Sequence, residues 1–308
     1  MSTATDDEAL WENPAPLATG HRMHASTSHA SPVLAAPRWR WPMLLKASAA
    51  CHLGAGAAVI AQPALWPWAL GAVALDHALI TATGLWPRST WLGDNMRRLP
   101  PASAARGEVS LTIDDGPNPA VTPAVLDLLD AAGARATFFC IARAAEAHPQ
   151  LCREIVRRGH SVQNHSHGHL HNFSLLGPRG FAREIEQAQD SLSQITGQRP
   201  RFFRAPAGLR NPFLAAVLHA QSLQLVSWTR RGFDTLRTEP TGVLARLTRG
   251  LAAGDILLLH DGNAALAPSG VAVVLEVLPE LLRRFDHDGL RAVSLVDAVP
   301  TPPAEVLA

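Results

Sequence analysis

The chain has 308 residues, 47% of them hydrophobic, and a formal net charge of +1. This length allows two average domains, or one large α/β domain with an appendage. The near-zero charge, with no continuous stripe of arginines, excludes a nucleic-acid-binding class, because phosphate backbones require concentrated positive charge. The odd number of cysteines, three, favours a reducing compartment over a disulfide framework.

The N-terminal segment, residues 1–38, is rich in Ser, Thr, Ala, His and Pro without periodicity, and we expect a disordered tail. Three acidic residues, Asp6, Asp7 and Glu8, occupy the place of the basic start of a signal peptide. No secretory signal is therefore expected at Met1.

Residues 39–91 predict a hydrophobic helical hairpin. Two apolar runs, 42–61 and 64–86, each have the roughly 20 residues that a helix needs to cross a bilayer. Six of the eight tryptophans flank these runs, as in the aromatic belts of membrane proteins: Trp39, Trp41, Trp66, Trp68, Trp86 and Trp91. Asp76 and His77 count against a simple span, and a soluble, partner-binding helical subdomain is the alternative. We favour insertion of residues 42–86 into a membrane.

The flanking charges predict the orientation of this hairpin. The tip of the hairpin carries no Lys or Arg. The basic residues lie toward its two ends: Arg38, Arg40, Lys46, Arg88, Arg97 and Arg98. The positive-inside rule places both ends, and the domain that follows, on the cytoplasmic side of an inner membrane.

After a linker at 92–106, residues 107–298 alternate strand and helix, and 299–308 read as a C-terminal tail. Seven strands separated by helices predict a parallel sheet, most simply closed into a barrel. The expected strands are 108–113, 136–141, 161–164, 202–204, 224–228, 256–260 and 292–295.

Two adjacent carboxylates, Asp114 and Asp115, end the first of these strands, and Gly116-Pro117 then breaks it. Like charges this close require a shared cation or proton. Taken alone, Asp-Asp-Gly-Pro is as readily a solvated turn. The carboxyl edge of a parallel sheet is, however, where α/β proteins place their chemistry.

A His-rich segment follows the third strand, and its His165 and His169 are four residues apart. On a helical turn their imidazoles would share a face. With Asp115 they supply two nitrogens and one oxygen, a set that leaves coordination positions open, as a catalytic metal site requires. The alternative is a solvated His-rich loop without a functional role.

Two further strand ends carry polar side chains. Arg204 can hold a carboxylate bidentately and keep it ionised. His260 ends an apolar strand and, taken alone, is equally well explained as a core residue. All four motifs lie at the same edge of the expected sheet, which favours a joint functional site.

The order Thr-Ile-Asp-Asp-Gly-Pro, His-Ser-x-x-His, Arg-x-Pro-x-Gly and Leu-x-x-His resembles the polysaccharide deacetylases of carbohydrate esterase family 4, which share the NodB-homology domain. The resemblance covers about Gly107 to Val296. It implies an irregular (β/α)7 barrel, preceded here by the two-helix hairpin.

The resemblance also implies roles for individual residues. Asp114 would be the general base and His260 the general acid, with Arg204 holding Asp114. A divalent metal, usually Zn²⁺ with Co²⁺, Ni²⁺ or Mn²⁺ as alternatives, would be bound by Asp115, His165 and His169. A backbone N–H near Ala207 would stabilise the oxyanion.

The sequence departs from the family pattern at two places. Ala207 stands where members often have an aromatic residue. In the fourth motif, Arg231 and Thr235 replace an Asp and a Trp, and only Asp234 is kept. We expect either that Asp234 takes over the tuning of His260 or that His260 titrates differently. Arg230 and Arg231 are candidates for contact with a substrate phosphate.

The leading hypothesis is a metal-dependent deacetylase that hydrolyses the N-acyl group of an amino sugar in a glycan, a glycan precursor or a lipid-linked sugar. The alternative is a non-catalytic membrane-bound protein that binds such sugars and retains the fold. A cytoplasmic catalytic domain would put extracellular peptidoglycan out of reach.

Overall fold

The computed structural model describes residues 39–300. The predicted disordered tail (1–38) and most of the predicted C-terminal tail (301–308) lie outside the described residues.

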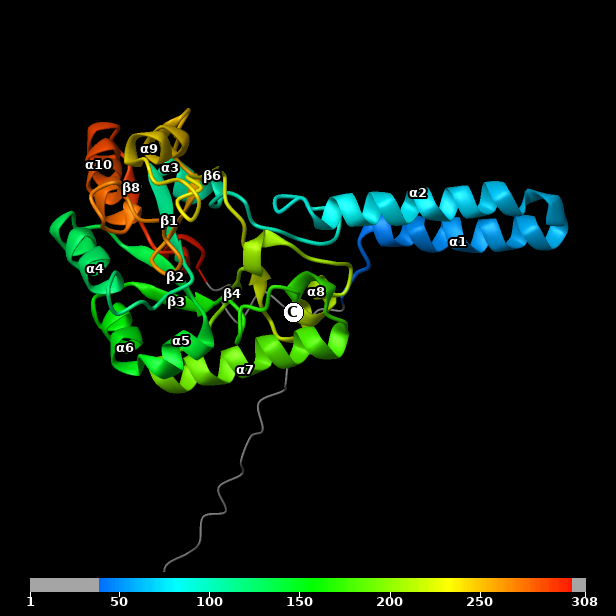
Figure 1. The fold of residues 1–308 in the computed structure, drawn as a ribbon, viewed down its shortest axis with the longest axis horizontal. Coiled ribbons are helices and arrows are strands. Elements are labelled where there is room, and N and C mark those ends of the chain that lie inside the picture. Colours follow the sequence, from blue (N-terminus) through cyan, green and yellow to red (C-terminus); the bar gives the residue numbers. More distant parts are fainter. Residues whose placement is uncertain (1–38, 301–308) are drawn as a thin grey trace, which may run out of the picture. The chain divides into compact units, whose positions relative to one another are not determined.

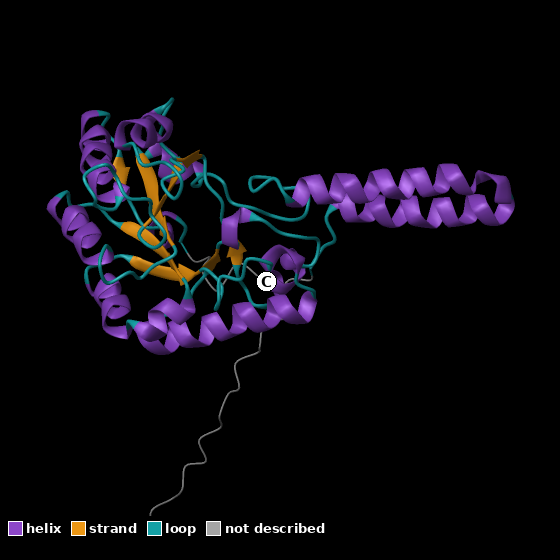
Figure 2. Ribbon diagram, in the orientation of Figure 1, coloured by secondary structure: helices purple, strands orange, loops and turns teal. Residues whose placement is uncertain are grey.

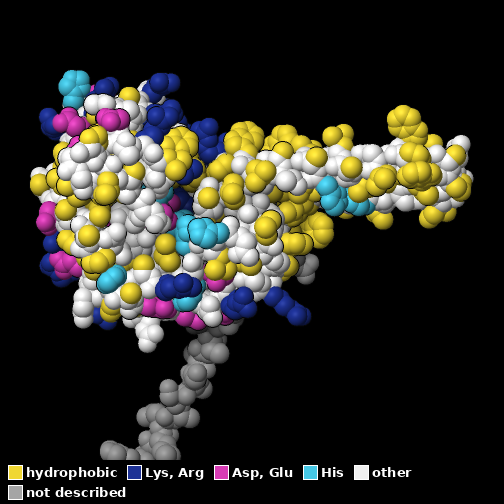
Figure 3. All heavy atoms as spheres, viewed as in Figure 1, with side chains coloured by type: hydrophobic (Ala, Val, Ile, Leu, Met, Phe, Trp, Pro, Cys, Tyr) yellow, Lys and Arg dark blue, Asp and Glu magenta, His cyan; other side chains and the backbone are white. Residues whose placement is uncertain are grey.

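The predicted hairpin is formed by two helices that lie side by side (Figure 1), α1 (Met43–Ala61) and α2 (Trp66–Gly84), joined by the short 3₁₀ helix η1 (Pro63–Leu65). Both helices are apolar on all sides and long enough to cross a membrane, and hydrophobic side chains cover the visible face of the hairpin (Figure 3). A helix that is apolar all round and not covered by protein suits a lipid surrounding better than water.

Polar side chains of α1 and α2 bond to one another, Ser48 and Asp76 between the helices and His52 and His77 on their exposed surface. Ser48 Oγ donates to Asp76 Oδ2 at 2.7 Å, and the Nε2 atoms of His52 and His77 lie 3.1 Å apart. The Asp76 carboxylate, which argues against a simple membrane span, therefore has a hydrogen-bond partner within the hairpin, as ionisable groups in membrane segments usually do.

The sheet that follows is parallel and curled into a half-barrel (Figure 2). Its hydrogen-bonded order is β5-β4-β3-β2-β1-β7-β6, with β8 paired to β1. The central strands β1, β2 and β7 are buried along their whole length, and β2 and β7 are accordingly almost entirely apolar, whereas β1 alternates apolar and polar residues. The strands are β1 (Glu108–Asp114), β2 (Ala136–Cys140), β3 (Ser161–Asn164), β4 (Phe202–Phe203), β5 (Gln224–Leu225), β6 (Arg230–Arg231), β7 (Ile256–His260) and β8 (Arg291–Ala292).

The expected barrel is confirmed, but the number of strands is eight rather than seven. The stretch 224–228 was expected as one strand, whereas the structure ends β5 at Leu225 and starts β6 at Arg230. These two strands are the opposite edges of the sheet, so residues 226–229 carry the chain from one edge to the other. This crossing segment joins the two edges of the half-barrel through the chain itself, since β5 and β6 are not paired with each other by hydrogen bonds.

Helices cover the outer face of the sheet, and the largest apolar cluster lies between the two layers. The helices that contribute to this cluster are α4 (Thr122–Ala131), α5 (Ala142–Ala147), α6 (Pro149–Arg157), α7 (Pro178–Thr196), α9 (Pro240–Thr248) and α10 (Val273–His287). The other helices that follow the hairpin are α3 (Pro101–Ala105), α8 (Leu214–Ala220) and α11 (Leu295–Ala298), with 3₁₀ turns η2 (Phe173–Leu175) and η3 (Pro206–Gly208).

Two expectations about chain segments need correction. The stretch 92–106 is more than a linker, because Leu92 and Leu99 are buried, Met96 bridges to Val226, and α3 lies within it. The last strand was expected to reach Leu295, but it ends at Ala292, because the Ser294 side chain caps the start of α11.

Candidate active site

The four sequence motifs meet at the carboxyl edge of the sheet. Asp114 ends β1 directly opposite His260 at the end of β7, and Arg204 follows β4. His165 follows β3, which is paired to β4. The parallel arrangement thus brings together side chains that are up to about 150 residues apart in the sequence.

Asp115, His165 and His169 form one cluster. Asp115 Oδ1 lies 3.1 Å from His165 Nε2 and 3.2 Å from His169 Nε2. The expected helical turn that would align the two histidines is wrong. They lie in a loop, in which Ser166 and His169 adopt left-handed backbone angles (φ 64° and 47°). This loop conformation, rather than helical spacing, turns the two rings toward the same carboxylate.

The cluster fits a divalent metal. Asp115 Oδ1 is buried and has no hydrogen-bond partner, so an acceptor oxygen faces two ring nitrogens with nothing to satisfy it. His165 Nδ1–H donates to the carbonyl of Arg204 at 2.8 Å, which fixes the tautomer and directs the Nε2 lone pair to the cluster. Two imidazole nitrogens and one carboxylate oxygen are a donor set typical of catalytic zinc sites.

The pKa values of the three side chains in the cluster are shifted by their burial and by one another, in a way that suits the binding of a cation. Burial opposes ionisation of Asp115, but the imidazoles close to it, above all that of His165, hold its pKa well below the usual range. Burial lowers the pKa of His165, yet the carboxylates of Asp114 and Asp115 raise it overall. Burial and the neighbouring His165 lower the pKa of His169. The site therefore holds a carboxylate and at least one neutral imidazole near neutral pH.

Asp114 lies beside this cluster and is held by Arg204. Both side chains are buried, and Arg204 Nη1 donates to Asp114 Oδ1 at 2.6 Å. The same guanidinium also donates to Thr112 Oγ1 and to the carbonyls of Val226 and Ser227 in the crossing segment. Burial lowers the pKa of Arg204 and the Asp114 carboxylate opposes this effect. Asp114 Oδ2 is left free of Arg204 and lies 3.9 Å from His165 Nε2.

His260 is paired with Asp234, one of the two possibilities left open by the altered fourth motif. Asp234 accepts the His260 Nδ1–H at 2.9 Å and the His260 backbone N–H at 2.7 Å. Although burial disfavours the charged ring, the Asp234 carboxylate raises the pKa of His260 overall. Asp234 is thus in position to tune the titration of His260.

One buried acid near the site was missed. Asp261 accepts hydrogen bonds from the Thr122 hydroxyl and the Gly262 backbone, and burial raises its pKa to about 7. Its carboxylate packs against Gly116, where any side chain would collide with it. Its position directly after His260 was the signal available in the sequence.

The loop after β4 also contacts the end of the hairpin. Gly208 has a left-handed φ of 75°, and an added Cβ would lie 2.6 Å from Pro87 and 2.7 Å from the Trp228 ring. The Pro87 carbonyl accepts the Ser227 hydroxyl at 2.7 Å, and the Gly84 carbonyl accepts the Arg210 N–H at 3.2 Å. Only glycine fits where these two segments meet.

Comparison with known proteins identifies the family. The family model described as polysaccharide deacetylase matches residues 102–226, which contain the first three motifs but not Asp234 or His260. A chitooligosaccharide deacetylase of Sinorhizobium fredii is 31% identical over 198 residues, which are 61% of this chain and 92% of the relative. A peptidoglycan-N-acetylglucosamine deacetylase of Bacillus cereus is 30% identical over 188 residues, 57% of this chain and 82% of the relative.

The fold is also similar to a solved structure, a family 4 carbohydrate esterase from Streptomyces lividans in complex with acetate. The two are 31% identical with a TM-score of 0.55, over 60% of this chain and 91% of that one. The chain is therefore a hydrolase that belongs to the polysaccharide deacetylase family, carbohydrate esterase family 4 with the NodB-homology fold.

Proposed function

We propose that this protein hydrolyses the N-acyl group of an amino sugar with the help of a divalent metal, Zn²⁺ being the best match to the donors. The observation that carries the proposal is the unsatisfied Oδ1 of Asp115 between two imidazole nitrogens, beside a second carboxylate that is held apart by Arg204. The names of the two relatives, both deacetylases of N-acetylated sugars, support the reaction class.

Asp115, His165 and His169 would hold the metal, which supplies Lewis acidity to the amide carbonyl and to water. Asp114 acts as the general base. Arg204 occupies Oδ1 and leaves Oδ2 free to accept a proton from the attacking water. Because Arg204 is itself buried, the carboxylate cannot rotate away without losing a charge-assisted bond.

His260 acts as the general acid. Its Nδ1–H is engaged by Asp234, so the proton given to the departing amine comes from Nε2. Asp234 stabilises the charged ring, so that His260 is protonated when the amide bond begins to break and can then give its Nε2 proton to the amine. The exposed Ala207 has a left-handed φ of 55° in η3, and its backbone N–H is the oxyanion donor in this scheme.

The hairpin anchors the enzyme in a membrane, with residues 92–298 as the catalytic part on the cytoplasmic side. The exposed apolar surface of α1 and α2 and the excess of Arg and Lys beyond both ends support this placement. The substrate would then be a glycan precursor or a lipid-linked sugar at the inner leaflet. A reporter fused to the C-terminus tests the side: activity of a periplasm-specific reporter would contradict the cytoplasmic assignment.

The reaction is tested by acetate release from N-acetylated chito-oligosaccharides, peptidoglycan fragments and lipid-linked N-acetylglucosamine, with the purified full chain. Asp114→Asn should lower kcat by roughly 10²–10⁴-fold while leaving the bound metal in place. Asp190→Asn, an exposed acid on α7, is the matched control and should have wild-type activity. Full metal occupancy without hydrolysis of any substrate would favour the non-catalytic sugar-binding alternative.

A further inference from the structure

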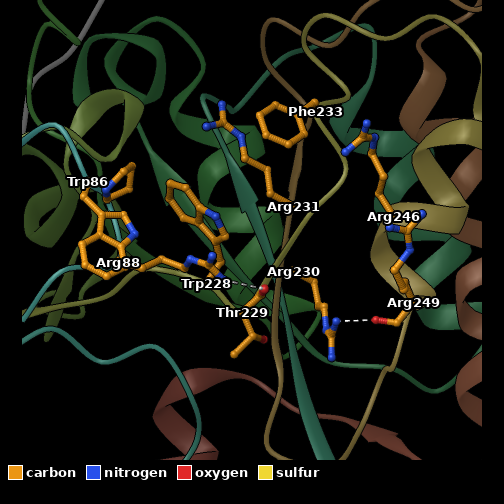
Figure 4. Close-up of a pocket in the computed structure, with 10 residues that line it drawn as sticks. Trp86, Arg88, Trp228, Thr229, Arg230, Arg231, Phe233, Arg246 and Arg249 are labelled. Carbon is orange, nitrogen blue, oxygen red and sulfur yellow. Dashed lines mark hydrogen bonds between the residues drawn. The ribbon is translucent and has the colours of Figure 1, made fainter.

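A cavity of about 450 Å³ lies beside the crossing segment, and its lining is strongly basic. Five arginines face it, Arg88, Arg230, Arg231, Arg246 and Arg249, and no acidic residue lines it. Figure 3 shows basic side chains, all of them arginines, gathered over α9 and β6, the same part of the surface. Figure 4 shows the arginines approaching the cavity from opposite sides, Arg88 from the segment after α2, and Arg246 and Arg249 from α9 and its end. We call this cavity the arginine pocket.

Most of these charges are not neutralised by the protein. Arg230 pairs with Asp255 at 2.9 Å and donates to the carbonyls of Arg249 and Gly250. Within residues 39–300, the guanidinium groups of the other four make no ion pair with a carboxylate. Arg231 Nε is in addition buried without a hydrogen-bond partner. A buried donor without an acceptor beside several unpaired cations indicates that an anion is missing.

Aromatic side chains hold two of the guanidinium groups in place. The Arg231 guanidinium lies 5.2 Å from the Trp228 ring centre and 4.8 Å from that of Phe233, and Arg246 lies 5.6 Å from Phe233. Such stacking leaves the edges of the planar groups, which carry the N–H donors, free for a ligand. These two guanidinium groups are thus held in place before a ligand binds.

The arginine pocket adjoins the candidate active site. The Trp228 ring also lies 5.7 Å from the guanidinium of Arg204, the partner of Asp114. Phe233 directly precedes Asp234, the partner of His260. A ligand that filled both places would have its acyl group near Asp114 and its anionic group beyond Trp228.

We propose that the arginine pocket binds the phosphate or diphosphate of a phosphate-linked N-acyl amino sugar, an inference that rests on the proposed function and narrows its substrate. Phosphate esters suit this site better than a carboxylate because three or more acceptor oxygens can engage several guanidinium forks at once. The phosphate could belong to a soluble sugar phosphate or to a lipid-linked sugar. Trp86 and Arg88 follow directly after α2, so a lipid-linked phosphate would lie at headgroup level when α2 spans the membrane.

The test compares the full chain with the double variant Arg246→Gln/Arg249→Gln, whose replaced side chains are exposed. Arg179→Gln, an exposed arginine on α7 outside the pocket, is the matched control. Three probes are used: N-acetylglucosamine 1-phosphate, a polyprenyl-phosphate-linked N-acetylglucosamine in nanodiscs, and neutral N,N′-diacetylchitobiose. The readouts are kcat/KM from acetate release and, in an Asp114→Asn background, Kd by calorimetry.

We expect the double variant to lower the ratio of kcat/KM for a phosphate-linked probe over the neutral probe by at least about tenfold, and to weaken Kd for that probe similarly, with the control unchanged. A Lys at position 246, Arg246→Lys/Arg249→Gln, should recover part of the loss because it restores the charge but not the fork. A loss confined to the polyprenyl probe, or to the soluble one, supports the proposal and identifies the source of the phosphate.

Equal losses for neutral and phosphate-linked probes, or no loss with either, would overturn the proposal while leaving the deacetylase function intact. Should the wild-type chain hydrolyse none of the probes, the proposed function fails, and the Kd comparison still decides the pocket: unchanged affinity for the phosphate-linked probes in the double variant refutes it.

Discussion

The buried pair of Arg204 and Asp114 allows a quantitative test by a double-mutant cycle. The two groups are in contact at 2.6 Å and almost inaccessible to water, with relative exposures of 1% and 3%. Unit charges centred about 4 Å apart attract by about 4 kcal/mol at an effective dielectric constant of about 20. Removing one partner leaves the other charge buried without compensation, which typically costs about 3–5 kcal/mol.

We therefore expect Arg204→Met to lower the free energy of unfolding by about 3–5 kcal/mol and Asp114→Asn by somewhat less, because an amide oxygen still accepts from Arg204. The double variant should be less destabilised than the sum of the two, by about 2–4 kcal/mol of coupling. Even if Arg204→Met alone were too unstable to purify, Arg204→Lys keeps the charge and allows a second cycle.

The assay is urea unfolding of the full chain in detergent, followed by far-UV circular dichroism, with the m-value required to stay constant across the cycle. An exposed pair on α10, Arg283 and Glu280, is the matched control, and its cycle should give less than about 1 kcal/mol. A coupling below about 0.5 kcal/mol for Arg204 and Asp114 would refute the view that a buried, mutually dependent charge pair holds the general base.

Three further predictions follow from the same geometry. Because the Asp234 carboxylate raises the pKa of His260, Asp234→Asn should move the alkaline limb of the kcat/KM profile to lower pH, since the acid then loses its proton earlier; an unmoved limb would exclude His260 as the acid. His165→Ala should weaken Zn²⁺ binding by about 100-fold or more, measured by competition with a chromophoric chelator, and unchanged affinity would remove His165 from the ligand set. Burial lowers the pKa of His160 to about 4 from 6.5, and its Nδ1 accepts the Ala136 N–H, so the native state resists protonation. The free energy of unfolding that this neutral His160 contributes above pH 6.5 is lost as the pH falls toward 4, and the loss is about 2 kcal/mol between pH 7 and pH 5. We expect His160→Gln to remove this part of the pH dependence of the free energy of unfolding, measured by urea unfolding.

The sequence carried enough information for the barrel and for the four strand-end motifs. Apolar runs such as 256–260 are buried strands because both faces of a parallel sheet are covered, and glycines such as Gly197 end helices in the left-handed conformation. Motifs that follow parallel strands must lie at one edge, so the meeting of Asp114, Arg204 and His260 followed from topology alone.

The elements that sequence patterns did not predict are those decided by tertiary contacts. β6 has two residues, too few for any periodicity, and exists because β7 offers a free edge. The left-handed turn at Ser166 that orients His165 has no signal in residue spacing. The sequence pointed to Arg230 and Arg231 of the arginine pocket, but Arg88 and Arg246, far from them in the chain, join the pocket only through the fold.

The contacts at Gly208 bear on how the enzyme finds its substrate. Hydrogen bonds and steric contact join the end of α2 to the loop after β4 and to the crossing segment. If the hairpin lies in a bilayer, as proposed, these contacts would hold the candidate site close to it. A substrate in the same bilayer would then reach the site by diffusion in the plane of the membrane, whereas a dissolved polymer would have to reach the site from solution.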